Sequence, residues 1–137
     1  MLRTVADANV LISAFIASGP PHRFFRHCLA RRVTLIVSPP MLEELTGVLR
    51  RPKFKLSPAE VSGVVQIVAE AAEIVEARER HGIVPDDPDD DVIMSAAIDG
   101  RAAYIVTGDK ALLDLSTYEG IDIMPVAKFL REILKES

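Results

Sequence analysis

A series of short apolar runs alternates with amphipathic segments of helical length along the whole chain, and this alternation constrains the fold most. The runs carry β-branched or other apolar residues at nearly every position. Continuous apolar runs are typical of strands in a parallel sheet that is covered on both faces, and the amphipathic segments predict the covering helices. The expected strands are 2–6, 33–37, 74–76, 103–107 and 121–124.

Start and stop signals place the helices between these strands. Ser38 precedes two prolines and begins a helix that ends near Arg50, while Ser57 and Glu60 form a capping-box pattern at the start of another. A polar loop is expected over 81–91, followed by a helix over 92–98 that stops at Gly100. The other helices are expected at 10–17, 21–31, 110–115 and 125–135.

Length and composition agree with one α/β domain over residues 1–137, with helices on both faces of the sheet. With 49% hydrophobic and 26% charged residues, the composition excludes a disordered chain, a collagen-like repeat and a disulfide scaffold. The lone Cys28 is typical of a reducing compartment. No apolar run reaches the ~18 residues of a membrane helix, and the first residues lack a secretory pattern, so a cytoplasmic protein is expected.

The net charge of −4 is distributed unevenly along the chain. Eight lysines and arginines lie between His22 and Lys55, against two glutamates, whereas five aspartates and no basic residue lie between Asp86 and Asp91. A basic segment can attract phosphates, and a dense group of acids can attract cations. The basic candidates for gripping a nucleic-acid backbone are Arg50, Arg51 and Lys53.

The acids are expected at one edge of the sheet, because the carboxyl ends of parallel strands meet there. Asp7 follows the first strand, Asp109 follows the fourth, and Glu43 and Glu44 lie in the helix after the second. At ~5 Å, with an effective dielectric constant of about 20, each pair of carboxylates repels by roughly 3 kcal/mol. Protons or a divalent cation must offset this repulsion. Carboxylates without a His or Cys cluster suit Mg²⁺ or Mn²⁺, which commonly act on phosphates.

Each acidic segment taken alone has a simple structural interpretation. Asp7 is a possible helix cap, Glu43 and Glu44 are ordinary solvated helix residues, and the aspartate run is a turn with a cap. Residues 107–109 alone are a tight turn. The functional interpretation depends on their convergence at one edge.

Several segments in the same order along the chain resemble the PIN domain, and look most like the VapC-type toxins of bacterial and archaeal toxin–antitoxin pairs. The first is Val5-Ala6-Asp7-Ala8-Asn9 with Val10–Ser13, and the last is Ile105–Lys110 with Leu112-Leu113. Between them lie Ser38–Leu45 with Val48–Phe54, and Asp86–Ile93 leading to Ala96-Ala97. Together these segments cover nearly the whole chain.

The resemblance implies a three-layer α/β/α sandwich with a five-stranded parallel sheet in the order 3-2-1-4-5. It also implies an endoribonuclease that depends on Mg²⁺ or Mn²⁺, in which water activated by the metal hydrolyses a phosphodiester. The catalytic acids fall on Asp7, Glu44, Asp90 and Asp109. Asp7, Asp90 and Asp109 would hold the metal, and Glu44 would orient or deprotonate the water.

Four further residues match supporting positions. Asn9 and Thr107 correspond to polar residues that help to hold the acids, and Asp87 and Asp91 are further supporting candidates. The run Asp89-Asp90-Asp91 also allows the main ligand to shift by one residue, and Asp114 competes with Asp109. As a toxin of this family, the chain would act on RNA, bind a cognate antitoxin protein and form a homodimer.

Other functions remain open from the residues alone. A PIN-like module that binds RNA or protein without cleavage is the main alternative, although it would be expected to lose some of the acids. A phosphorylated receiver domain needs two adjacent acids after the first strand, and an aspartyl phosphatase needs a second acid two residues after the first. The chain has Asp7-Ala8-Asn9 there, which disfavours both.

Overall fold

The computed structural model describes residues 2–85 and 87–136. Met1, Asp86 and Ser137 lie outside the described residues, so the start of the expected acidic run at Asp86 is not placed. The described strands form one sheet in the order β3-β2-β1-β4-β6-β5. Their bounds are β1 Arg3–Ala6, β2 Thr34–Val37, β3 Ala72–Ile74, β4 Tyr104–Val106, β5 Thr117–Tyr118 and β6 Ile121–Met124.

The expected α/β fold with a parallel sheet is confirmed, but the expected count of five strands is wrong. Strands β3, β2, β1, β4 and β6 are parallel and follow the expected order, with Val5 of β1 opposite Ile36 and Ile105 on its two neighbours. The sixth strand, β5, pairs with β6 in the antiparallel sense through a tight turn at Glu119 and Gly120, both at positive φ. Two residues are too few to produce a recognisable strand pattern.

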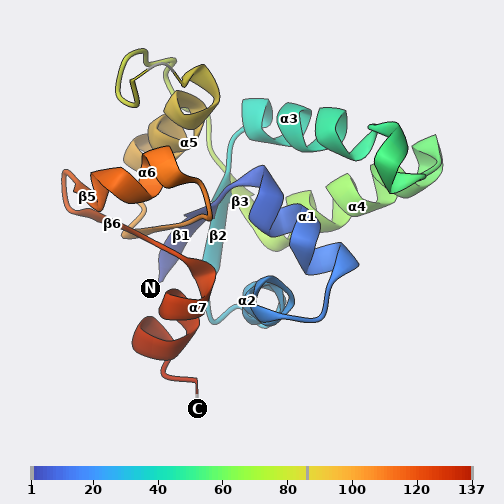
Figure 1. The fold of residues 1–137 in the computed structure, drawn as a ribbon, viewed down its shortest axis with the longest axis horizontal. Helices are drawn as coiled ribbons and strands as arrows, with labels where there is room; N and C mark the ends of the chain where they lie inside the picture. Colours follow the sequence, from blue (N-terminus) through green and yellow to red (C-terminus); the bar gives the residue numbers. More distant parts are fainter. Residues whose placement is uncertain (1, 86, 137) are drawn as a thin grey trace.

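Helices cover both faces of the sheet (Figure 1). Because parallel crossovers are right-handed, the helices that follow β1 and β2 pack on one face, and those that follow β3 and β4 pack on the other. The first group contains α1 Ala8–Ile16, α2 Pro20–Leu29, α3 Pro39–Leu49 and α4 Pro58–Ala71. The second contains α5 Pro88–Asp99 and α6 Lys110–Leu115.

Several element boundaries differ from the expectation, and three of them concern the starts or ends of α5, β3 and the C-terminal helix. Helix α5 begins at Pro88, so Asp89, Asp90 and Asp91 belong to its first turn and not to a loop, because Asp87 caps the helix. Strand β3 ends at Ile74 and does not reach residue 76. The C-terminal helix is α7 Val126–Lys128 followed by a π-helical turn over Phe129–Ile133, short of Lys135.

The core lies between the sheet and both helical layers. Phe24 and Tyr104 each contact Phe129 edge to face, with ring centroids 5.7 and 5.3 Å apart. Phe25, Val61 and Val68 are also buried, so these positions of α2 and α4 form part of the core. Cys28 is fully buried in the same core. The exposed large apolar side chains are Ile16, Leu29, Ile67 and Ile74.

The carboxyl ends of β1 and β4 define where a site can form. These two strands are neighbours, and the connections from them leave in opposite directions along the sheet. A crevice therefore opens beyond their carboxyl ends, as in other open parallel sheets. None of the helices over residues 2–85 and 87–136 is both long and apolar enough to cross a membrane.

Candidate metal centre

Asp7 is the first residue after β1, and the end of β4 holds it in place. Its carboxylate accepts a hydrogen bond from the backbone N–H of Val10 at 2.9 Å, and so caps α1. Its second oxygen accepts a hydrogen bond from the hydroxyl of Thr107. The hydroxyl oxygen of Thr107 also accepts a hydrogen bond from the backbone N–H of Asp109 at 2.9 Å. Thr107 thereby links the two chain segments that carry Asp7 and Asp109.

Asp87 and Asp109 also cap helices. Asp109 accepts a hydrogen bond from the N–H of Leu112 at 3.1 Å at the start of α6, and Asp87 accepts one from the N–H of Asp90 at 3.3 Å at the start of α5. The partial positive charge at a helix N-terminus stabilises a carboxylate there. Capping therefore fixes these acids at the edge of the sheet and offsets part of their mutual repulsion.

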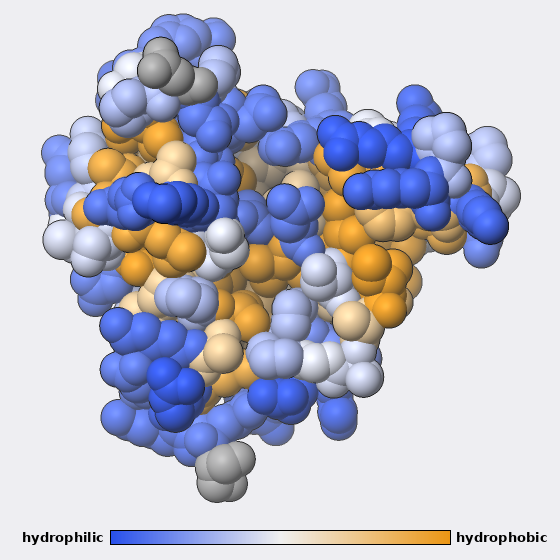
Figure 2. Space-filling model, in the orientation of Figure 1, coloured by the Kyte–Doolittle hydropathy of each residue, from blue (hydrophilic) through white to orange (hydrophobic). Residues whose placement is uncertain are grey.

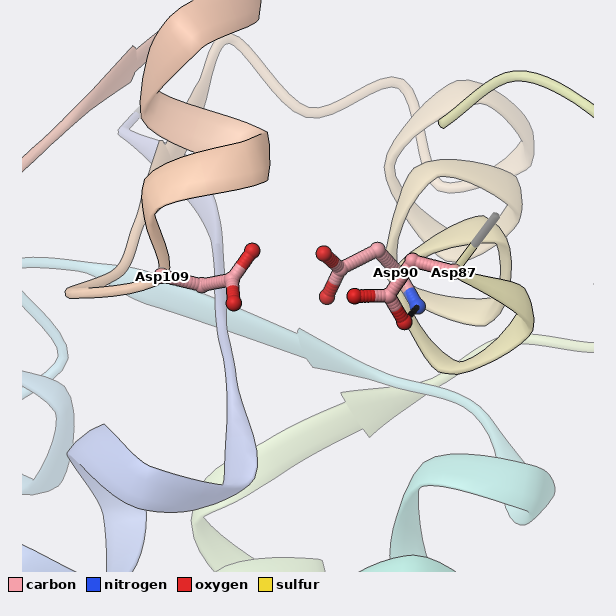
Figure 3. Close-up of side chains that lie close together, drawn as sticks. All are labelled: Asp87, Asp90 and Asp109. Atoms are coloured by element: carbon pink, nitrogen blue, oxygen red, sulfur yellow. Dashed lines mark hydrogen bonds between the residues drawn. The ribbon is translucent and has the colours of Figure 1, made fainter. Parts of the chain in front are cut away.

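Three carboxylates converge from the starts of α5 and α6 (Figure 3). One oxygen from each of Asp87, Asp90 and Asp109 lies within 4.8 Å of the others, and Asp109 points across the gap toward the other two. Asp90 is 8% exposed, and its Oδ2 atom is buried without a hydrogen-bond partner among the described residues. A buried polar oxygen of this kind is costly unless something binds it.

The three carboxylates lie in a polar hollow of about 200 Å³, which we call the acid cavity. Asp7 and the half-buried Glu44, from the middle of α3, contribute to its walls. Arg51 is a basic side chain in this wall and lies just beyond the end of α3. The other polar residues of the wall are Asn9 and Asp89.

Burial and crowding change the proton affinities of these acids. Burial, followed by the facing carboxyls of Asp109 and Asp87, raises the pKa of Asp90 to about 8. The facing carboxyl of Asp90 is the main cause that lowers the pKa of Asp109. Burial also raises the pKa of Asp7, although its bonds from Thr107 and Val10 oppose the change.

The pKa of Glu44 is also raised. Burial is the main cause, and the charges of Asp89, Asp7 and Asp87 add to it, whereas Arg51 opposes it. A carboxylate with a raised pKa accepts a proton more readily near neutral pH. Glu44 therefore has the electrostatic surroundings of a general base.

The structure brings the four acids with expected catalytic roles, Asp7, Glu44, Asp90 and Asp109, to one cavity. Other expected site residues lie elsewhere. Asp91 lies outside the cavity wall, where it accepts hydrogen bonds from the N–H groups of Gly82 and Val84, both at 2.8 Å. Arg50 and Lys53 are exposed beyond the end of α3, outside the cavity wall.

Two residues play a larger part than the sequence indicates. Asp87, expected only as a supporting residue, stands among the three closest carboxylates, and Asp89 lines the cavity. The signal for Asp87 is Pro88, which favours a cap at the preceding residue. Asp114, the expected competitor of Asp109, is exposed and pairs with Lys110 at 2.8 Å.

The donor set fits a hard divalent cation. Such a cation prefers carboxylate oxygens, and the acid cavity offers several of them with one buried oxygen still unpaired. The described part of the chain supplies no histidine or cysteine to the cavity wall, which disfavours a zinc site. Asp87, Asp90 and Asp109 could hold such a cation, since one oxygen of each lies within 4.8 Å of the others.

Comparison with known proteins agrees with this geometry. A family model described as PIN domain matches residues 3–111, which extend from β1 into α6. The matched region contains every acid of the cavity. A search of curated proteins finds no match to the chain.

Proposed function

This chain belongs to the PIN domain family, and we propose that it is an endoribonuclease that uses Mg²⁺ or Mn²⁺. PIN domains are generally nucleases that depend on divalent metals. The observation that carries the proposal is the convergence of Asp87, Asp90 and Asp109, with an unpaired buried oxygen on Asp90. Such a group is costly to maintain unless a cation occupies it.

In the proposed reaction, different residues of the acid cavity bind the cation and activate the water. When bound, the cation would offset the negative charge of the phosphate and make water a better nucleophile. Asp87, Asp90 and Asp109 hold it, with Asp7 beside them in the same cavity. Glu44 orients the attacking water and takes its proton. The water oxygen then forms a bond to phosphorus, the bond between phosphorus and the leaving ribose oxygen breaks, and this oxygen takes up a proton from solvent.

Arg51 is placed to contact the RNA backbone next to the reacting phosphate, because it lines the acid cavity. Arg50 and Lys53 extend the positive charge outward from the end of α3. Arginine can bind a phosphate through two parallel hydrogen bonds. These contacts would hold RNA of any sequence, since phosphates carry no sequence information.

The test is cleavage of mixed RNA by the purified protein with Mg²⁺ or Mn²⁺, with and without a chelator. We expect cleavage that the chelator abolishes and that falls at least a hundredfold in Asp7→Asn and Asp109→Asn, as expected for lost charge stabilisation. Asp114→Asn is the matched control, because this exposed acid pairs only with Lys110 among the described residues. Cleavage that survives the chelator would contradict the proposal. RNA binding without any cleavage would favour a non-catalytic module.

We also propose that the chain is the toxin of a toxin–antitoxin pair and that it forms a homodimer. What supports a protein partner is an open apolar groove between α1, α2 and α4, lined in part by Phe15, Ile16, Leu29 and Ile67. Growth arrest on expression of the native chain, but not of Asp109→Asn, tests the toxin role. Light scattering of the purified protein tests the dimer.

A further inference from the structure

A second hollow lies beside the acid cavity at the same edge of the sheet. We call it the proline cleft, and it has a volume of about 320 Å³. The starts of α1, α2 and α7 and the turn after β4 form its walls, which include Asn9, Ser13, Pro20, Pro21, Gly108 and Pro125. Figure 2 shows apolar side chains exposed between α1 and α7 on this face. Asn9 lines both hollows, so the two lie next to each other.

The walls of the proline cleft combine apolar surface with a few polar groups. The three prolines contribute rings without an N–H group, and Gly108 leaves open space, since a Cβ atom built there has no neighbour within 4 Å. Asn9 is exposed and can both donate and accept hydrogen bonds through its amide. Ser13, one turn further along α1, adds a hydroxyl.

This chemistry fits a nucleobase. A base has two apolar faces that pack on flat apolar side chains, and a polar edge that amides and hydroxyls can bind. An RNA whose phosphate lies in the acid cavity carries a base within reach of the neighbouring cleft. The cleft lacks the charged side chains expected of a second phosphate site among its described wall residues.

We propose that the proline cleft receives the base of the nucleotide next to the phosphate in the acid cavity, and that Asn9 positions this base. This inference rests on the proposed ribonuclease activity, and adds a specificity-determining subsite to it. The base packs against the proline rings, and the amide of Asn9 binds its edge. Asn9 is a positioning residue, because its contact is with the base and not with the reacting atoms.

The first experiment measures binding, independently of cleavage. Backbone amide signals of the isotope-labelled protein are followed by NMR during titration with adenosine, uridine, cytidine or guanosine 5′-monophosphate in Mg²⁺. We expect shifts at Ser13, Gly108 and Ala127 for at least one nucleotide. Ala127→Trp adds a bulky ring at an exposed position of the cleft wall and should remove them, whereas Ala127→Ser should keep them.

The second experiment measures cleavage of oligoribonucleotides that lack one base at successive positions around the cut. Removal of the base at one flanking position should lower kcat/KM about tenfold or more, as expected when base stacking is lost. The same removal should have little further effect in Ala127→Trp. Asn9→Ala should flatten the preference among the four bases at that position, mainly through KM.

Two outcomes would overturn the proposal. One is nucleotide-induced shifts that avoid the cleft, or shifts at the cleft caused by an apolar peptide and by no nucleotide. The other is cleavage that is indifferent to base removal at every flanking position. If no RNA is cleaved at all, the proposed activity fails separately, and the NMR titration still decides whether the cleft binds a base.

Discussion

The unpaired carboxylate oxygen of Asp90 links stability to function at the residue scale. We predict that Asp90→Asn raises the unfolding free energy of the metal-free protein at neutral pH by about 1 kcal/mol or more, because the folded protein must otherwise keep a proton on this buried carboxyl, whose pKa is raised to about 8. The same change should abolish stabilisation by Mg²⁺. Chemical denaturation with and without Mg²⁺ measures both effects. Equal stabilisation of the variant and the native protein by Mg²⁺ would place the cation elsewhere, and Asp114→Asn is the control.

Thr107 supports a second prediction at this scale. Its hydroxyl donates to Asp7 and accepts from the N–H of Asp109, so Thr107→Val loses one buried and one partly buried hydrogen bond at nearly constant volume. We expect a loss of about 1–3 kcal/mol in unfolding free energy, measured by urea denaturation. Thr107→Ser keeps the hydroxyl and should recover most of this loss. A valine variant as stable as the native protein would show that the bonds to Thr107 contribute little.

At the scale of elements, two adjacent acids of α5 have different roles. Asp90 faces the acid cavity, while Asp91 binds the N–H groups of Gly82 and Val84 and so anchors the preceding loop to the helix. We predict that Asp91→Ala destabilises the protein by about 2–4 kcal/mol, because the buried N–H group of Val84 and the partly buried N–H group of Gly82 both lose a charged acceptor. Faster hydrogen exchange at Gly82 and Val84 would confirm the cause. Exchange unchanged at these amides would contradict it.

The end of α3 supports a prediction about RNA binding. Replacing Arg51 and Lys53 by alanine should weaken binding to RNAs of all sequences to a similar degree. It should also reduce the slope of log affinity against log salt by about one for each phosphate that the variant no longer binds. Fluorescence anisotropy over a range of salt concentrations measures both. Arg101→Ala is the matched control, since Arg101 is exposed at the opposite edge of the sheet, where α5 leads into β4. An unchanged slope would exclude these two residues from backbone binding.

At the scale of the whole molecule, the acid cavity sets how stability depends on pH. The pKa values of Asp7, Glu44 and Asp90 are raised in the folded protein, so the folded state holds protons that the unfolded state releases. Their contribution is full below the unfolded pKa, near 4, and is lost as pH rises through the folded pKa, about 8 for Asp90. Stabilisation by Mg²⁺ should therefore grow from pH 5 to pH 8, measured by denaturation at each pH. A constant effect of Mg²⁺ would contradict this linkage.

The sequence predicts the plan of the molecule better than its details. Apolar runs identify β1, β2, β4 and β6, and the parallel arrangement brings Asp7 and Asp109 to one edge, as the strand pairing confirms. Local signals could not show β5, which has two residues. The start of α5 does have a local signal in Pro88, but the run of aspartates around it favours a loop at first sight. The closeness of Asp87 to Asp109 depends on how α5 packs across the sheet, which no local pattern records.

Asp7, Asp87 and Asp109 each begin a helix as well as line the acid cavity. A homologous chain that has lost catalytic activity would therefore still need capping residues at these three positions. Asparagine, serine or threonine would replace the aspartates in such a lineage, and alanine or leucine would be selected against by the unravelling of α1, α5 and α6. Capping residues at these three positions are therefore expected even in a PIN domain that no longer cleaves RNA.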